Sequence, residues 1–123
     1  LKKLGLSQTG ITDVGLGHVA SLRNLEDLNL TKTQITDAGL VSVKALPRLR
    51  TLCLSDTAVT AQGLNHLVGM RRLRELTIVH TRISEAEAKD WHRRMPFVFV
   101  RGDTVWLQGE KEGVADGSDG GQP

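Results

Sequence analysis

A 24-residue repeat runs through most of the sequence and limits the folds open to it. Leucine recurs every 24 residues, and the positions three and five residues later are apolar in four consecutive units. The recurring columns are Leu1, Leu25, Leu49, Leu73; Leu4, Leu28, Leu52, Leu76; Leu6, Leu30, Leu54, Ile78; and Thr9, Thr33, Thr57, Thr81. Self-similarity at a fixed period predicts an array of equivalent structural units.

Each unit has two halves with different apolar spacing. In residues 25–48, Leu28 and Leu30 alternate with polar residues, which predicts a short strand with one buried face. Leu40, Val43 and Leu46 are spaced by three, which predicts a helix with one apolar stripe. A strand and a helix within 24 residues cannot close a core alone, so the units must stack and bury their apolar faces against one another.

The consensus of the units is L-x-x-L-x-L-x-x-T-x-I-T-D-x-G-L, and three units end it with Gly15-Leu16, Gly39-Leu40 and Gly63-Leu64. This pattern resembles leucine-rich repeats. The T-D-x-G-L variety is similar to the cysteine-containing subclass of F-box substrate adaptors and to bacterial, planctomycete-type repeat proteins. The resemblance implies an α/β solenoid, a right-handed βα horseshoe arc with a parallel sheet on the concave side and helices on the convex side.

We expect one leucine-rich-repeat domain over residues 1–109. Its units are 1–24, 25–48, 49–72 and 73–96, followed by a C-terminal cap strand in 97–109. Residues 110–123 combine glycines with a net charge of −3, which predicts a disordered acidic tail. Because the sequence starts in the middle of the consensus, we also expect further repeats or a cap before Leu1.

All four aromatic residues fall near the end of the array. They are Trp91, Phe97, Phe99 and Trp106. A solenoid must shield its last core layer, and large rings suit that role. We therefore expect the aromatic side chains to cover the C-terminal end of the core.

The hydroxyl and charged columns have structural explanations. A threonine after each strand can satisfy a backbone group of the turn. The later hydroxyl column is predicted to cap the helices, and acidic residues follow it in the first helical turn. These residues are Thr12, Thr36, Thr60 and Ser84, followed by Asp13, Asp37 and Glu85. Cations near the helix ends suit the helix dipole: Arg23, Arg48, Arg71, Arg72, Arg93 and Arg94.

The positions of cysteine and histidine argue against catalysis. His18 and His66 occupy one helical column two units apart, roughly 16–20 Å, which is too far to share a metal ion. Cys53 and His80 are predicted to lie roughly 11 Å apart, too far for a nucleophile and its base. We expect no enzymatic activity, no metal and no cofactor. Acids beside the bases argue against nucleic-acid binding, and the apolar runs are too short for a membrane span.

The favoured function is a non-catalytic protein–protein interaction module that uses the concave sheet face, with an unidentified protein partner. The candidate contact residues are Asp27, Asn29, Arg50, Arg74, Glu75 and His80. Two alternatives stay open: a structural spacer or C-terminal cap of a longer receptor or scaffold array, and a targeting appendage of an enzyme whose catalytic domain lies upstream. We expect a monomer unless the open N-terminal edge associates.

Overall fold

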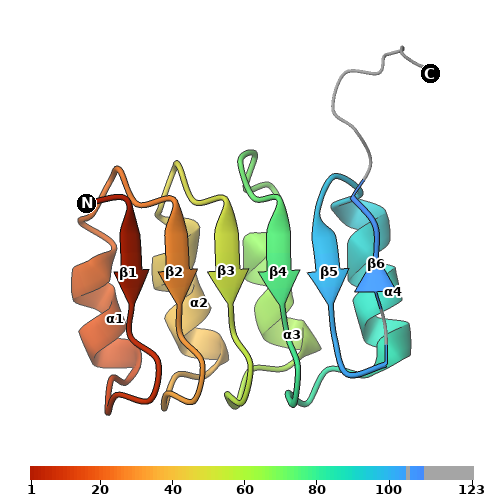
Figure 1. Ribbon diagram of the computed structural model, residues 1–123, viewed down its shortest axis with the longest axis horizontal. Coiled ribbons are helices and arrows are strands. Elements are labelled where there is room, and N and C mark those ends of the chain that lie inside the picture. The colour runs from red at the N-terminus through yellow and green to blue at the C-terminus, as the bar shows by residue number, and fades with distance from the viewer. Residues whose placement is uncertain (105, 110–123) are drawn as a thin grey trace.

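The described residues form a single sheet of six strands, with the helices on one side of it (Figure 1). The computed structural model describes residues 1–104 and 106–109, so the predicted tail lies outside the described residues. Five strands run parallel in chain order: β1 (Lys3–Gly5), β2 (Asp27–Asn29), β3 (Thr51–Cys53), β4 (Glu75–Thr77) and β5 (Phe99–Arg101). The last strand, β6 (Trp106–Leu107), pairs antiparallel with β5.

One helical segment follows each of the first four strands. They are α1 (Asp13–Val19), the 3-10 helix η1 (Asp37–Gly39) continued by α2 (Leu40–Lys44), α3 (Ala61–Leu64) continued by the 3-10 helix η2 (Asn65–Leu67), and α4 (Glu85–Arg94). The strand-then-helix order in every unit confirms the predicted α/β repeat fold. In the described ranges, every helix is too short or too polar to cross a bilayer.

The leucine columns stack in register across the sheet. Leu28 pairs with Leu4 on one side and Leu52 on the other, and Leu52 in turn pairs with Leu76. Val100 continues this row on β5. Each step of 24 residues therefore advances the chain by one strand, and the inward side chains form one continuous buried core with the apolar stripes of the helices.

The threonine after each strand satisfies the turn, as predicted. The Thr33 hydroxyl donates to the Leu30 carbonyl at 2.7 Å, and the Thr57 hydroxyl donates to the Leu54 carbonyl at 2.6 Å. Thr9 and Thr81 make the same contact in their own units. These turns also use a left-handed residue directly before each threonine, with φ between 56° and 58°: Gln8, Lys32, Asp56 and His80.

The second hydroxyl column caps its helices in only two of the four units, so that prediction is wrong for Thr12 and Thr60. Thr12 and Thr60 make no side-chain cap, and Thr36 accepts only a long hydrogen bond from the Ala38 N–H at 3.4 Å. The Thr36 N–H and hydroxyl instead both donate to the Asp13 carboxylate of the preceding unit. A carboxylate is the stronger acceptor, because hydrogen bonds to ionised groups are roughly twice as strong as neutral ones.

The same aspartate–threonine contact joins the second unit to the third. The Thr60 N–H donates to Asp37 Oδ1 at 2.6 Å, and the Thr60 hydroxyl donates to Asp37 Oδ2. Asp13 and Asp37 were predicted to act through the helix dipole of their own unit. Their main partners are in the next unit, 23 residues further along the chain.

The repeated glycine makes room for this contact. A Cβ atom at Gly63 would overlap the Asp37 carboxylate, and one at Gly39 would approach Asp13 Oδ1 to 2.5 Å. The glycine of one unit is therefore required by the aspartate of the unit before it.

The contact between the third and fourth units departs from this pattern, because the third unit has Ala61 at the position where the first two units have an aspartate. The Ser84 N–H has no carboxylate from the third unit to bind, and it donates to Glu87 in its own unit at 2.9 Å. The Ser84 hydroxyl accepts from the Glu87 N–H, which completes the predicted capping box. Lys89 and Thr104 hydrogen-bond to the Glu85 carboxylate nearby and hold its pKa below the usual range.

Only one aromatic residue enters the core. Trp91 on α4 is 2% exposed, and its indole N–H donates to the Leu64 carbonyl at 2.8 Å. Phe97 and Trp106 are 39% and 59% exposed, so the expectation that all four rings shield the core is wrong. The cause is strand alternation: Val98 and Val100 point inward, which turns the phenylalanines on either side of Val98 outward.

The contact between Asp37 and Gly63 predicts a strong coupling between these two residues. Gly63→Ala should lower the free energy of unfolding by about 1–3 kcal/mol, because the new methyl group displaces the carboxylate that holds Thr60. In the Asp37→Ala background the same change should be neutral or stabilising by up to about 1 kcal/mol, since alanine favours a helix over glycine. Urea denaturation of the four proteins measures the coupling.

Gly17→Ala provides the matched control for this cycle. Gly17 lies inside α1, and a Cβ atom there would contact only the Ser42 Oγ at 3.9 Å. This substitution should stabilise the protein by up to about 1 kcal/mol in either background. Additive effects of Asp37→Ala and Gly63→Ala would show that the glycine has no link to the aspartate.

The two tryptophans predict two distinct fluorescence responses. In a Trp91→Phe variant only the exposed Trp106 emits, so acrylamide should quench the emission strongly. In a Trp106→Phe variant only the buried Trp91 emits, and quenching should be weak. Trp91→Phe should also cost about 1 kcal/mol or more in urea denaturation, because the Leu64 carbonyl loses its donor. Equal quenching of the two variants would contradict this placement of the rings.

Candidate protein-binding surface

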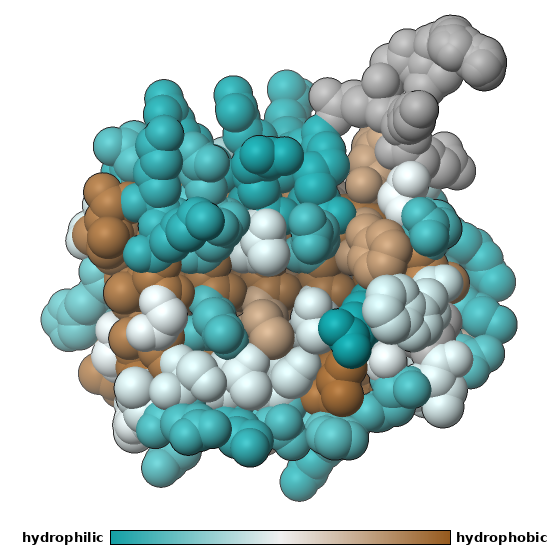
Figure 2. Space-filling view, in the orientation of Figure 1, coloured by the Kyte–Doolittle hydropathy of each residue, from teal (hydrophilic) through white to brown (hydrophobic). Residues whose placement is uncertain are grey.

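The side of the sheet opposite the helices is open, and its outward side chains form rows across the strands. We call it the open sheet face; it is the surface that the resemblance implies to be concave. One row runs through Lys3, Asp27, Thr51, Glu75 and Phe99, and the next through Gly5, Asn29, Cys53, Thr77 and Arg101. Figure 2 shows a largely apolar band along the middle of this face, between more polar edges.

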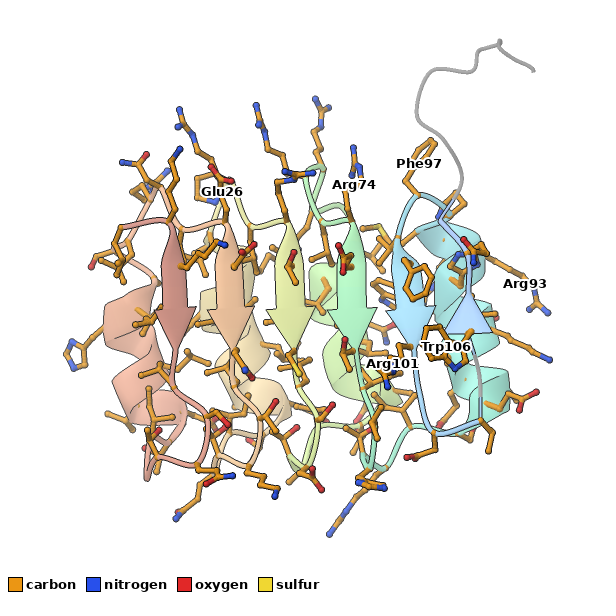
Figure 3. All side chains as sticks on the ribbon, in the orientation of Figure 1. Glu26, Arg74, Arg93, Phe97, Arg101 and Trp106 are labelled. Carbon is orange, nitrogen blue, oxygen red and sulfur yellow. The ribbon has the colours of Figure 1, made fainter. Side chains whose placement is uncertain are left out.

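The C-terminal end of the open sheet face carries a cluster of two rings and a guanidinium group. Phe99 and Trp106 meet edge to face, with ring centroids 5.6 Å apart and an interplanar angle of 85°. Arg101 Cζ lies 4.8 Å from the Trp106 ring centroid, within the range of a cation–π contact. Figure 3 shows Arg101 and Trp106 side by side on β5 and β6. We call Phe99, Arg101 and Trp106 the anchor cluster.

Sequence reasoning missed the anchor cluster. It placed no aromatic side chain on this face, because the four full repeats have none in their outward columns. The rings reach the face through β5 and through β6, which returns antiparallel beside it. The signal available in the sequence was the alternation of Phe97, Val98, Phe99 and Val100, which exposes one set of side chains when the other is buried.

A shallow hollow of about 330 Å³ lies at the other end of the same face. Gly5 and Cys53 contribute little side-chain volume there, so the strands between the longer polar side chains are left uncovered. Asp27 and Asn29, two of the predicted contact residues, line this hollow. The face therefore has an exposed aromatic cluster at one end and, at the other, a shallow hollow whose lining combines leucines with polar side chains.

Three of the predicted contact residues lie on the open sheet face. Asp27 Oδ2 is 3.7 Å from Lys3 Nζ, and Asn29 Oδ1 accepts hydrogen bonds from the N–H and hydroxyl of Thr31. Glu75 is exposed on β4, in register with Phe99 of the anchor cluster. Asp27 and Asn29 are held in position before any partner arrives, which lowers the entropic cost of binding.

Arg50 and Arg74 lie elsewhere, at the edge where the strands begin. Arg74 Nη1 donates to the carbonyls of Arg71 and Leu73, and its Cζ lies 5.9 Å from the centroid of the Phe97 ring. Figure 3 shows Arg74 and Phe97 at this edge, away from the anchor cluster.

His80 lies at the opposite edge, in the turn after β4. Its Nδ1 lies 3.4 Å from an Asp56 oxygen, and its Nε2 lies 3.5 Å from an Asp103 oxygen. The backbone N–H of His80 also donates a hydrogen bond to the Asp103 carboxylate. The six predicted residues therefore fall into three groups on the molecule. Their role in binding stays a prediction.

The described part of the chain offers no cluster of three or more histidine, cysteine or acidic side chains that could hold a metal ion. Cys53 Sγ lies 2.9 Å from the Thr31 hydroxyl and 3.7 Å from the Ser55 hydroxyl. Among the described residues its hydrogen-bond partners are hydroxyls, and neither is a base that could activate a thiol.

Comparisons with known proteins agree with the repeat pattern and the fold. A family model described as leucine rich repeat matches residues 1–59. A chain from the structure of Chaetomium Mex67:Mtr2 subunits is similar in fold, with a TM-score of 0.63 and 18% identity, over 86% of this chain and 82% of that one. No curated protein matches the sequence. Leucine-rich repeat domains are in general protein-interaction modules and are typically non-catalytic. Residues 1–59 thus match the leucine-rich repeat family, and the same 24-residue repeat and strand–helix fold continue through the fourth unit.

Proposed function

We propose that this protein is a non-catalytic interaction module that binds a protein partner through its open sheet face. The observation that carries the proposal is the anchor cluster. Tryptophan and arginine are enriched among the few residues that supply most of the free energy of a protein interface. Trp106 is 59% exposed beside a second ring, and exposed apolar groups that gather on a surface are typical of interaction sites.

The geometry of the anchor cluster suits binding. Contacts on two sides hold the Trp106 ring, since Phe99 meets it edge to face and Arg101 lies over it. A ring that is already fixed loses little conformational entropy when a partner covers it. Phe99 and Trp106 therefore present a preorganised apolar surface to a partner.

The remaining sheet residues give the face its selectivity in this proposal. Asp27 and Glu75 supply negative charge, and the hollow beside Asn29 admits a protruding side chain of the partner. Charged groups around an apolar centre contribute mainly to specificity and to the association rate. The other three predicted residues lie at the two edges of the sheet: Arg50 and Arg74 where the strands begin, and His80 in the turn after β4. They would contact only a partner that extends past the open sheet face.

A structural cap is the second candidate function. The antiparallel pairing of β6 with β5 interrupts the series of parallel strands, and β6 covers the hydrogen-bonding edge that β5 would otherwise present. This arrangement favours a role for residues 97–109 in ending a repeat array. The two functions are compatible, because the anchor cluster lies on the strands that form the cap.

Charge reversal and truncation at the anchor cluster test the proposed binding. An Arg101→Glu, Trp106→Ala variant should bind its partner at least about 30-fold more weakly, since each residue is a candidate for a loss of about 2 kcal/mol. The wild-type chain would first capture the partner from a lysate of the native cells. The partner would then be produced separately, and its affinity for each variant would be measured by biolayer interferometry.

The matched control is Arg82→Glu, Val14→Ala, which removes the same charge and an exposed apolar side chain away from the sheet face. This control should bind within about twofold of the wild type. Equal affinity of the anchor variant and the wild type would reject the open sheet face as the binding site.

A further inference from the structure

Cationic residues gather at one edge of the molecule. The chain segments 20–26, 44–50, 68–74 and 92–98 run from the ends of the helices to the following strands, with the last residues of α2 and α4 included. Together they form this edge, which we call the basic edge. They carry nine cations and one acid, Glu26, a net charge of +8, whereas the whole chain carries +2. The cations are Arg23, Lys44, Arg48, Arg50, Arg71, Arg72, Arg74, Arg93 and Arg94. Figure 2 shows hydrophilic colour along most of this edge.

The opposite edge has the opposite sign. Residues 6–13, 30–37, 54–61, 78–85 and 102–104 carry five acids and two cations, a net charge of −3. Both edges arise because a charge at one column of the repeat recurs every 24 residues and so forms a row. Positive and negative charge are therefore separated along the strand direction, with the cations where the strands begin and the acids where they end.

The helix dipole accounts for only part of the basic edge. The dipole acts within the last turn of a helix, and α2 ends at Lys44, four and six residues before Arg48 and Arg50. Arg93 and Arg94 have a carboxylate partner in Asp90. Within the described ranges no carboxylate lies within 4.0 Å of five other cations of this edge: Lys44, Arg48, Arg50, Arg71 and Arg72.

Two adjoining pockets open between these cations. The larger, of about 380 Å³, has an apolar lining that includes Met70, Met95, Pro96 and Phe97, and Arg71, Arg74 and Arg94 also line it. The smaller, of about 230 Å³, is lined by Leu46, Pro47 and Leu49 together with Lys44, Arg71 and Arg72. Met70 and Arg71 belong to both, so the pockets form one groove along the edge.

We propose that the basic edge is a second binding surface, and that its occupant is an acidic peptide segment of a partner protein with one apolar side chain in the larger pocket. Cations that lack carboxylate partners complement a chain of glutamates or aspartates. The pocket is larger than a leucine or phenylalanine side chain, and methionine adapts its shape to whichever side chain enters. This surface goes beyond the proposed function, which uses the open sheet face.

A peptide fits this surface better than a nucleic acid does. Binding to single-stranded nucleic acid uses several aromatic platforms on which successive bases stack. Phe97 is the one phenylalanine, tyrosine or tryptophan in the four segments of the basic edge, and Arg74 already lies over its ring. Apart from its three arginines, the larger pocket is lined by apolar groups that include Leu73, Val98 and two thioethers, which suit a buried apolar side chain.

Fluorescence anisotropy of the full chain with a labelled peptide of glutamates around one central phenylalanine tests the proposal. The wild type should bind this probe, and replacing its phenylalanine with serine should weaken binding about tenfold. Arg71→Glu, Arg72→Glu should weaken binding at least about tenfold, because two cations beside the groove become acids. Both side chains are exposed, so the variant should keep the far-ultraviolet circular dichroism of the wild type.

Lys32→Glu, Arg82→Glu is the matched control, since it makes the same charge change at the opposite edge. It should change the affinity for the probe less than about threefold, as expected for long-range electrostatics at physiological salt. Equal losses in both variants would show that only net charge matters and would overturn the proposal. A wild-type chain that binds a single-stranded oligonucleotide and does not bind the peptide would also overturn it.

The acidic segment 110–123 of this chain is a competing occupant. A variant of the whole chain with Glu110, Glu112, Asp116 and Asp119 changed to their amides removes the acidic side chains of this segment and leaves Lys111 as its one charged side chain. Probe affinity in this variant should stay within about threefold of the wild type. Binding of the probe that appears only in the amide variant would assign the basic edge to the chain's own segment and overturn the proposal of a separate partner.

Discussion

Every unit of this protein depends on its neighbour, because a three-residue strand and a short helix cannot bury their own leucines. The apolar columns supply most of the stabilising contact, but leucine rows alone would allow units to slide or tilt. The aspartate–threonine contact fixes the spacing of the first three units: one carboxylate accepts two hydrogen bonds from the following unit, and the glycine of that unit leaves the space. The T-D-x-G-L consensus is therefore a description of contacts between units as much as within one.

The fourth unit shows what happens when one member of this contact is missing. Ala61 provides no acceptor, so the glycine that would make room for an aspartate is no longer needed, and Glu87 occupies its column. Glu87 then caps the helix from within the unit, and α4 extends to ten residues. Trp91, on this longer helix, fills the space against the third unit and binds the Leu64 carbonyl. One substitution in the third unit thus accounts for several features of the fourth.

The sequence was sufficient to predict the fold, because the apolar columns determine which residues face inward and the period determines which strands pair. The partner of Asp37 was not predictable in the same way, since both the helix dipole and a neighbouring unit are plausible for an acid at that column. The anchor cluster was missed for another reason. Whether Trp106 returns beside β5 or continues the array depends on the turn after β5. Gly102-Asp103 is a pair typical of hairpin turns, so the sequence carried a signal for this return that the repeat pattern does not contain. Hence the period was sufficient for the repeated part of the proposed binding surface, and its end required a separate turn signal.

The two proposed surfaces meet at β5. Phe97 lines the groove of the basic edge just before this strand, and Phe99 belongs to the anchor cluster on the strand itself. A partner that carries an acidic segment next to an apolar patch would reach both, and once one surface is occupied the second binds as an intramolecular event at a high effective concentration. Neither surface then needs high affinity alone. The net charge of +2 gives no indication of this charge distribution. The repeat places cations at one edge and acids at the opposite edge, and the two nearly cancel in the total.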